Sequence, residues 1–368
     1  MPDDPAITVL HYTGYDDDRG GIVAVIRALA ETGQFACVLG ANAGCVQNQT
    51  PPLPLQALPP LDGEIISFHN FRRARKTAGA VREWLRADPR RVFHGHSRAG
   101  LLVALWLHWL GERRVVVSVH GYGRQRWFYR WAARRLGGRL YWLSPAMRDY
   151  YGVAGQAWDQ CVPGGVPDRF ARLGRVAPEP GKLRLGGAGA LVRWKRWQLV
   201  GEALALLPSE IRPGVSFEHI GSAPPDADSA AYAADLARTG MPGVTWRGAE
   251  PSSDRLLQGI DLYVVAAHAE PFSMAMQEAL AAGVPVVAAD SGGARDLIVP
   301  GKNGWLFRDG DARALATLLA ERLRSGDWCR LDRTAIRQSA WPAVRVAARW
   351  REIYGEVIGP PGAAIIEL

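Results

Sequence analysis

The stretch AEPFSMAMQEALAAGVPVVAADSGG, residues 269–293, places two glutamates around the junction between a loop and a helix. Glu270 precedes a proline, and Glu278 lies in an alanine-rich run that favours a helix. Ser273 is suited to cap the start of this helix, and Gly283 is suited to end it. The pattern therefore predicts a helix with one carboxylate in the loop before it and one in its second turn.

Apolar residues on both sides of this junction predict two strands. DLYVVAA (261–267) comes before the loop, and VPVVAAD (284–290) follows the helix. The helix would then begin at the carboxyl end of a strand, where free N–H groups suit a phosphate. A nucleotide sugar could present its phosphates to these groups and its hydroxyls to both carboxylates. A purely structural interpretation is equally open, because an acidic residue before a helix also stabilises the helix dipole.

The length and composition indicate a globular protein of more than one domain. At 368 residues the chain exceeds the size that one hydrophobic core usually organises. The longest apolar stretch, residues 101–110, is too short to cross a bilayer. The acidic start runs directly into a strand, unlike a secretory signal, and the four cysteines show no C-x-x-C spacing. We therefore expect a cytoplasmic protein with reduced thiols.

Short β-branched runs alternate with helical stretches along the chain, which is typical of parallel sheets covered by helices. ITVLHY (7–12) and VVVSVHG (115–121) are two such runs in the first half. The alternation stops in the Gly- and Pro-rich segment 161–184 and then restarts, as expected around a domain linker. The sequence therefore predicts an α/β protein with two Rossmann-like, doubly wound domains facing a central cleft. Ligands of such sheets bind beyond the carboxyl ends of the strands.

Positive charge is concentrated in the first half of the chain. Residues 64–148 contain 18 Lys or Arg against 4 Asp or Glu, a local net charge of +14, while the whole chain carries +8. Within this region, the segment 124–139 mixes six arginines with four aromatic residues. It favours an anionic membrane surface or an anionic acceptor, with a solvated helix face as the alternative. No zinc knuckle, helix-turn-helix or RNP motif accompanies the charge, so we expect no nucleic-acid partner.

The stretch EPFSMAMQEALAAGVPVVAADSGGARDLIVPGKNGWLF, residues 270–307, resembles the family-4 retaining glycosyltransferases of the GT-B fold. The shared signature is a Glu, seven residues and a second Glu, followed by a glycine pair and an N-G-x-L/V turn. Further landmarks follow in the family's order over nearly the whole chain: DRGGIV (18–23), SVHGYG (118–123), LSPAMRDYYGV with CVPGGVP (143–167), GALVRWKRWQLVGEALALL (189–207), HIGSAPP (219–225) and VTWRGAEPSSDRLLQGIDLYVVAA (244–267).

The resemblance implies which domain binds the acceptor and which binds the donor. It places an N-terminal acceptor-binding domain at residues 1–168 and a C-terminal domain that binds the nucleotide-sugar donor at residues 169–341. A C-terminal helix within residues 342–368 would pack back on the first domain.

By the same resemblance, three residues take part in the reaction. Glu270 would contact hydroxyls of the donor sugar, and Lys195 would neutralise the diphosphate that leaves with the nucleotide. A fixed cation there would lower the barrier, because negative charge builds on the leaving group in the transition state. His120 would contact the hydroxymethyl group of the donor sugar, unless it is simply a packed histidine at a strand end.

The remaining donor contacts are carried over in the same way. Glu278 would hold the ribose hydroxyls, and backbone amides at 272–274 would meet the sugar and the phosphates. Glycines would let the loops approach the donor without a side-chain clash. The full donor-binding set is Gly20, Gly21, Arg193, Arg247, Phe272, Ser273, Met274, Glu278, Gly292 and Gly293.

Two positions depart from the family pattern: Asp296, where Glu is commoner after the glycine pair, is a mild change, and the other matters more. Where an Arg usually precedes the lysine by five residues, this chain has Ala190. Arg193 or Arg196 could compensate from the same loop. Otherwise the activity would be low, or the donor would be held differently.

The implied chemistry is front-face transfer from a UDP- or GDP-sugar with retained anomeric configuration and no required cofactor. A metal is not expected, because there is no D-x-D motif, and His94 and His96 lack carboxylate or cysteine neighbours at ligand spacing. Weaker candidates for the acceptor site are His96, Arg98 and Arg124.

We therefore expect a hexosyltransferase-type glycosyltransferase acting on a glycan or lipid-linked acceptor. Bacterial surface polysaccharide or lipopolysaccharide synthesis is the expected context, in the cytoplasm or peripherally on the inner membrane face. Two alternatives remain. A nucleotide-sugar epimerase of the same fold would need carboxylate acid/base partners, which we cannot place. A degenerate, non-catalytic nucleotide-sugar-binding protein is prompted by Ala190.

Overall fold

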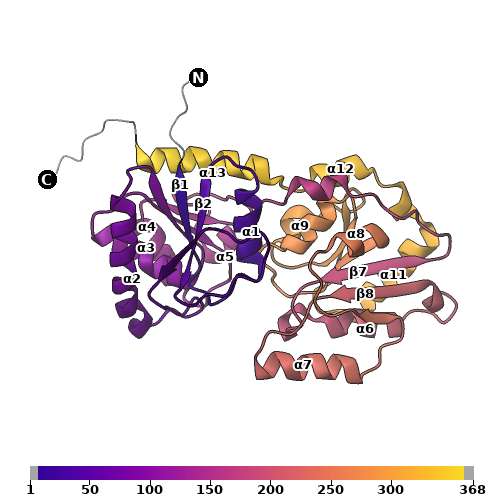
Figure 1. Ribbon diagram of the computed structural model, residues 1–368. Helices are drawn as coiled ribbons and strands as arrows, with labels where there is room; N and C mark the ends of the chain where they lie inside the picture. The colour runs from indigo at the N-terminus through magenta and orange to yellow at the C-terminus, as the bar shows by residue number, and fades with distance from the viewer. Residues whose placement is uncertain (1–6, 360–368) are drawn as a thin grey trace. The chain divides into compact units, whose positions relative to one another are not determined.

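The computed structural model describes residues 7–359, and contacts between residues divide the chain into two compact units (Figure 1). The first unit runs to Gly165 and resumes at Pro342, and the second unit is Val166–Trp341. The boundary falls inside the Gly- and Pro-rich segment 161–184, at Gly165 rather than after residue 168.

A six-stranded parallel sheet forms the centre of the first unit, in the order β3-β2-β1-β4-β5-β6. The first strand, β1, lies in the middle of this sheet, and the later strands are added outward in both directions, which is the doubly wound pattern. The strands are β1 Thr8–Tyr12, β2 Ala36–Asn42, β3 Leu55–Leu58, β4 Arg91–Gly95, β5 Val115–Val119 and β6 Leu140–Trp142. The helices are α1 Gly21–Ala30, α2 Phe68–Arg86, α3 Arg98–Trp109, α4 Arg126–Arg135, α5 Pro145–Tyr151 and α13 Ala343–Ile358.

The inner strands of this sheet are apolar on both faces. Every residue of β5 is buried, as expected for a parallel strand covered by helices on both sides. Helix α3, which contains most of the long apolar stretch of the sequence, buries most of its residues and contacts both β4 and β5. Among the described residues, no helix combines the length and apolar character needed to span a membrane.

Helix α13 returns the end of the described chain to the first unit. It contacts α1 and β4, and Figure 1 shows it in yellow along that unit. Its amphipathic face buries Trp350 and Tyr354, and the Tyr354 hydroxyl lies 2.7 Å from Nδ1 of His94. Packing and a buried hydrogen bond therefore both attach this helix to the sheet.

A second six-stranded parallel sheet, in the order β12-β11-β10-β7-β8-β9, forms the second unit. Its strands are β7 Leu183–Ala188, β8 Val215–Ile220, β9 Val244–Trp246, β10 Leu262–Val265, β11 Val286–Ala289 and β12 Gly304–Phe307. Its α-helices are α6 Trp197–Ala205, α7 Ala227–Arg238, α8 Asp254–Gly259, α9 Met274–Ala281, α10 Ala294–Leu297, α11 Ala312–Ser325 and α12 Arg333–Gln338. Four short 3₁₀ segments complete it: η1 Asp168–Arg172, η2 Arg193–Lys195, η3 Arg212–Gly214 and η4 Asp327–Arg330.

Two apolar clusters cover the two faces of this second sheet. On β10, Leu262 and Val264 belong to one cluster, while Tyr263 and Val265 belong to the other. This alternation follows from the twofold repeat of side chains along a strand. The predicted fold class, α/β with two doubly wound sheets, is confirmed.

Candidate functional site

Helix α9 begins where the sequence predicts, after β10 and an intervening loop. The Oγ atom of Ser273 accepts a hydrogen bond from the N–H of Met276 at 3.3 Å, which caps the helix. Phe272 and Ser273 are buried, so the main chain of this turn, rather than the Phe272 side chain, is what the site can offer a ligand. The first-turn N–H groups of α9 carry the positive end of the helix dipole.

The loop before α9 is held in shape by the glycine pair that follows β11. The N–H of Gly293 donates to the carbonyl of Glu270 at 2.9 Å. A Cβ atom on Gly292 would lie 2.4 Å from the Glu270 carbonyl oxygen, and one on Gly293 would lie 2.3 Å from that of Pro271. Ala269 adopts a left-handed backbone with φ of 50°, a conformation that costs about 1–3 kcal/mol for a residue other than glycine. This strained loop fixes the position of Glu270.

Lys195 and Glu270, 75 residues apart in the sequence, form a hydrogen-bonded ion pair. Their side chains are only 15% and 12% exposed, so solvent screens the pair weakly. The Lys195 ammonium also lies 4.5 Å from the ring centroid of Trp194, whose carbonyl accepts a hydrogen bond from His268 N at 3.2 Å. The structure thus joins the η2 loop to the loop before α9 and brings two of the three predicted catalytic residues together.

Glu278 occupies the flank of α9 and has a partner that the sequence analysis missed. Ser253 Oγ donates to Glu278 Oε2 at 2.6 Å. Ser253 is the N-cap residue of α8, but its side chain makes no capping bond there and donates to Glu278. Burial raises the pKa of Glu278, while the nearby charge of Arg169 lowers it. The serine before α8 was readable as an N-cap, but its contact with α9 was not.

The two arginines that could compensate for Ala190 have different partners. Arg196, itself in a left-handed conformation with φ of 53°, pairs with Asp309 at 2.9 Å. Asp309 also hydrogen-bonds to His268, next to the strained loop. Arg193 pairs instead with Asp228 of α7 at 2.9 Å. Arg193 therefore contacts α7 and not the Lys195–Glu270 pair in the described contacts, and its donor-binding role stays a prediction.

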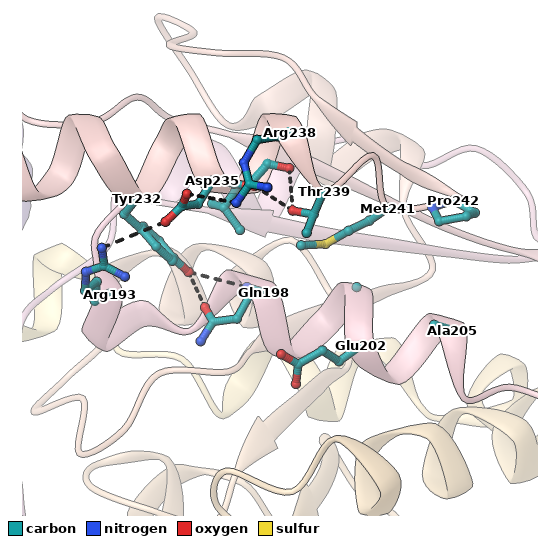
Figure 2. A pocket seen from close by; sticks show the side chains of 12 residues that line it. Arg193, Gln198, Glu202, Ala205, Tyr232, Asp235, Arg238, Thr239, Met241 and Pro242 are labelled. Carbon is teal, nitrogen blue, oxygen red and sulfur yellow. Dashed lines mark hydrogen bonds and ion pairs between the residues drawn. The ribbon is translucent and has the colours of Figure 1, made fainter.

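Arg193 lines a pocket of about 600 Å³ between α6 and α7, shown in Figure 2. Its lining includes Met241 and Gly201, and a Cβ atom on Gly201 would lie 1.8 Å from the Met241 sulfur. In Figure 2, Arg193 reaches toward Asp235 at one end of the pocket. None of the three predicted catalytic residues lines this pocket, so we do not assign the site to it.

Of three further predicted donor contacts, one is already paired with another residue and two are glycines, which have no side chain. Arg247, after β9, forms an ion pair with Glu218 of β8. Gly20 precedes α1 with φ of 94°, and its Cβ position is empty of neighbours within 4 Å. Gly20 and Gly21 therefore place no side chain at the N-terminus of α1, and their contact with a donor stays a prediction.

In the first unit, the predicted residue His120 follows β5 and belongs to a cluster of histidines. His96 Nδ1 lies 3.0 Å from His120 Nε2, and His96 Nε2 lies 2.9 Å from His11 Nδ1. His94, stacked on His96, bonds through Nδ1 to Tyr354 and through Nε2 to Ser118.

His11, His94 and His96 form the one group of three or more potential metal ligands found within residues 7–359, with ligand atoms within 4.8 Å of one another. Neutral imidazoles suit zinc, but this set includes no carboxylate or thiolate to balance a buried cation. Both nitrogens of His94 and of His96 already have hydrogen-bond partners. We therefore interpret the cluster as a hydrogen-bonded network.

Of the three predicted acceptor residues, two are at the surface. Arg98 forms an ion pair with Glu64, which also accepts a hydrogen bond from Tyr15 at 2.6 Å. Arg124 is exposed just before α4. His96, in contrast, is 2% exposed and lies behind His120, so it is buried rather than open to an acceptor.

Comparisons with known proteins agree with this fold. Residues 176–339 match the model of the family described as glycosyl transferases group 1. A GDP-mannose-dependent alpha-mannosyltransferase of Mycobacterium tuberculosis is 33% identical over 114 residues, which is 29% of each chain. The putative colanic acid biosynthesis glycosyltransferase WcaL of Salmonella typhimurium is 46% identical over 52 residues, 14% of this chain and 13% of WcaL. These matches span less than a third of either relative's length.

Among solved structures, Anabaena Alr3699/HepE in complex with UDP superimposes with a TM-score of 0.71 at 19% sequence identity. The match covers 95% of this chain and 99% of that chain. The family resemblance is thereby confirmed at the level of the group, whereas the narrower family-4 retaining assignment stays a prediction. The chain therefore has the two-domain GT-B fold, and its residues 176–339 match the glycosyl transferases group 1 family.

Proposed function

We propose that this protein transfers a sugar from a nucleotide-sugar donor to a glycan or lipid-linked acceptor, with retention of the anomeric configuration. The observation that carries the proposal is the ion pair of Lys195 and Glu270 in front of α9, with Glu278 on the flank of the same helix. One cation, one helix N-terminus and two carboxylates match the charge and hydroxyl pattern of a nucleotide sugar.

Each part of the donor has a complementary group in this proposal. The first-turn amides of α9 receive a phosphate. Glu278, oriented by Ser253, accepts hydrogen bonds from the ribose hydroxyls. In this structure, Lys195 and Glu270 neutralise each other. A bound diphosphate would compete with Glu270 for the ammonium and leave the carboxylate to bind sugar hydroxyls.

Lys195 then lowers the barrier of the chemical step. Charge builds on the diphosphate as the glycosidic bond breaks, and a fixed, weakly screened cation stabilises this charge more in the transition state than in the ground state. The family resemblance adds His120 as a contact to the donor sugar, and attack of the acceptor on the face that the diphosphate leaves. No cofactor is required in this scheme.

The names of relatives and the surface chemistry support a class of donor and a class of acceptor. GDP-mannose appears in the name of one relative, UDP in that of a structural neighbour, and colanic acid synthesis in that of another relative. These names support a UDP- or GDP-sugar and a role in polysaccharide or lipopolysaccharide synthesis. Helix α4 exposes Trp127 (65%) together with arginines, which suits an anionic, lipid-linked acceptor on the cytoplasmic face of a membrane.

A donor screen tests the proposal. The purified protein is mixed with UDP-, GDP-, ADP- and dTDP-sugars, and both thermal stabilisation and release of nucleoside diphosphate are measured. We expect one donor to stabilise the protein and to be slowly hydrolysed, and expect Glu278→Ala to lose both effects. Stabilisation without turnover would instead favour a non-catalytic binding protein, the alternative suggested by Ala190. Conversion of the donor sugar to its epimer would favour the epimerase.

A further inference from the structure

Three histidines of the first unit form one continuous hydrogen-bonded chain. His11 Nδ1 lies 2.9 Å from His96 Nε2, and His96 Nδ1 lies 3.0 Å from His120 Nε2. The rings come from β1, from the residue after β4 and from the residue after β5, which are neighbours in the sheet. The sheet order therefore places three residues from distant parts of the sequence in a row.

The rings of this chain are uncharged at neutral pH. Burial lowers the pKa of His11 to about 3, and it lowers the pKa of His96 and of His120 below the ordinary value. His11 and His96 are 0% and 2% exposed, in agreement with this cause. A neutral imidazole carries a single N–H, so each ring can donate from one nitrogen and accept at the other.

The middle ring makes the two hydrogen bonds of the chain interdependent. If His96 accepts from His11 at Nε2, it must donate to His120 from Nδ1, and all three rings then carry the proton on Nδ1. If the direction is reversed, all three rings carry the proton on Nε2. A mixed arrangement would place two N–H groups, or two bare nitrogens, against each other.

The two ends of the chain differ in access. His11 Nε2 is buried and has no hydrogen-bond partner. His120 Nδ1 has no partner among the described residues either, but it is not one of the fully buried unpartnered atoms, so solvent or a ligand can reach it. The tautomer of His11 at the buried end is therefore linked to whether Nδ1 of His120 at the accessible end donates or accepts a hydrogen bond.

We propose that His11 and His96 are positioning residues that couple the tautomer of His120 to their own, so that the three rings change tautomer only together and their shared state sets whether the open Nδ1 of His120 donates or accepts. The consequence for catalysis rests on the proposed function, in which His120 meets the donor sugar. A ring that is already in the required tautomer binds the sugar oxygen without first losing the freedom to switch between two forms.

Nuclear magnetic resonance of protein labelled with ¹⁵N-histidine tests the hydrogen-bonded row of histidines and does not require an assay of enzymatic activity. Two-bond ¹H–¹⁵N correlations distinguish the Nδ1–H, Nε2–H and doubly protonated rings. We expect the same neutral tautomer for His11, His96 and His120, unchanged between about pH 6 and pH 8 because the lowered pKa values lie far below this range. Different tautomers, a protonated ring, or stoichiometric metal in the purified protein would overturn the proposal.

Two variants test the coupling itself. In His11→Phe, which keeps an aromatic ring beside Phe35, His96 loses one partner, and we expect His120 to show a mixture of both tautomers. His69 is an exposed histidine that does not belong to the hydrogen-bonded row of His11, His96 and His120. His69→Gln is therefore the matched control and should leave the His120 signals unchanged. An unaltered His120 pattern in His11→Phe would contradict the coupling. The wild-type spectrum decides the question if this variant does not fold.

A double-mutant cycle then tests whether the hydrogen-bonded row of histidines affects kcat. We expect His11→Phe to reduce kcat by about threefold to tenfold, the worth of one neutral hydrogen bond, and to cause no further loss when His120 is already alanine. Equal losses in both backgrounds would mean that His11 acts on stability and not through His120. Absence of transferase activity in the wild type would refute the proposed function and leave the spectroscopic result standing.

Discussion

The hydroxyl of Ser253, at the start of α8, donates to the carboxylate of Glu278, in the second turn of α9, over 2.6 Å. This bond joins two helices of the second unit and orients the carboxylate that we assign to the ribose. It also explains why a half-buried acidic residue is tolerated there, since a hydrogen bond to the charged form offsets part of the cost of burial.

Replacing this carboxylate should stabilise the unliganded protein while removing nucleotide affinity. Burial raises the pKa of Glu278 in the folded state above its unfolded value, so ionisation of Glu278 opposes folding at neutral pH and this penalty fades as the pH falls through the folded-state pKa. We expect Glu278→Gln to raise Tm by about 2–4 °C at pH 7, with a smaller gain at acidic pH. Glu202→Gln, at a glutamate in the pocket of Figure 2, is the control. A lower Tm for Glu278→Gln would contradict this account.

A methyl group on Gly292 should disturb the loop that carries Glu270. The added Cβ would meet the Glu270 carbonyl oxygen at 2.4 Å, and the residue also has a left-handed backbone with φ of 56°. Gly301→Ala is a matched control, because Gly301 has φ of 76° but no atom within 4 Å of its Cβ position. We expect Gly301→Ala to cost about 1 kcal/mol of unfolding free energy and Gly292→Ala to cost at least about 1 kcal/mol more. Equal losses in urea titrations would mean that the close approach is unimportant.

The attachment of α13 to the first unit depends partly on one buried hydroxyl. Tyr354 lies 2.7 Å from Nδ1 of His94, and both residues are fully buried. We expect Tyr354→Phe to lower the unfolding free energy by about 1–3 kcal/mol, because it leaves a buried ring nitrogen without a partner. Urea denaturation followed by tryptophan fluorescence measures this loss. A loss below about 0.5 kcal/mol would show that the hydroxyl contributes little to docking.

Contact with an anionic membrane should depend on the exposed arginines of α4. Each cationic side chain near an anionic surface contributes about 1 kcal/mol, so the double variant Arg134→Gln with Arg135→Gln should weaken binding to phosphatidylglycerol vesicles by about 30-fold. Arg308→Gln, at an exposed arginine of the second unit, should bind as the wild type does. Cosedimentation at low and high salt gives both values. Equal binding by all three proteins would remove the membrane from the proposed function.

The sequence predicted most of the fold because local patterns determine it. Apolar β-branched runs marked the strands, and Ser273 with Gly283 marked the ends of the helix after β10. The resemblance gave Lys195 and Glu270 separate contacts to the donor, and the structure shows in addition that the two side chains pair, since each follows a strand of the same sheet at its carboxyl end.

Contacts that depend on sheet order were not predictable in this way. The row of His11, His96 and His120 exists because β1, β4 and β5 are neighbours and in register, with His11 opposite His94. Likewise, the left-handed backbone of Arg196 accompanies its pairing with Asp309, whereas Arg193 pairs with α7. No local pattern distinguishes these two arginines.

The most direct measurement of the central claim is sugar transfer by Lys195→Met. The donor identified in the screen is supplied with a lipid-linked saccharide extract, and the rate of product formation is compared with that of the wild type and of Lys182→Met. Lys182 is a surface lysine paired with Glu179, and it serves as the control for loss of a charge. We predict that Lys195→Met loses at least about 100-fold in kcat, while the product made by the wild type keeps the anomeric configuration of the donor. Transfer by Lys195→Met at the rate of Lys182→Met would contradict the proposal that Lys195 stabilises the departing diphosphate.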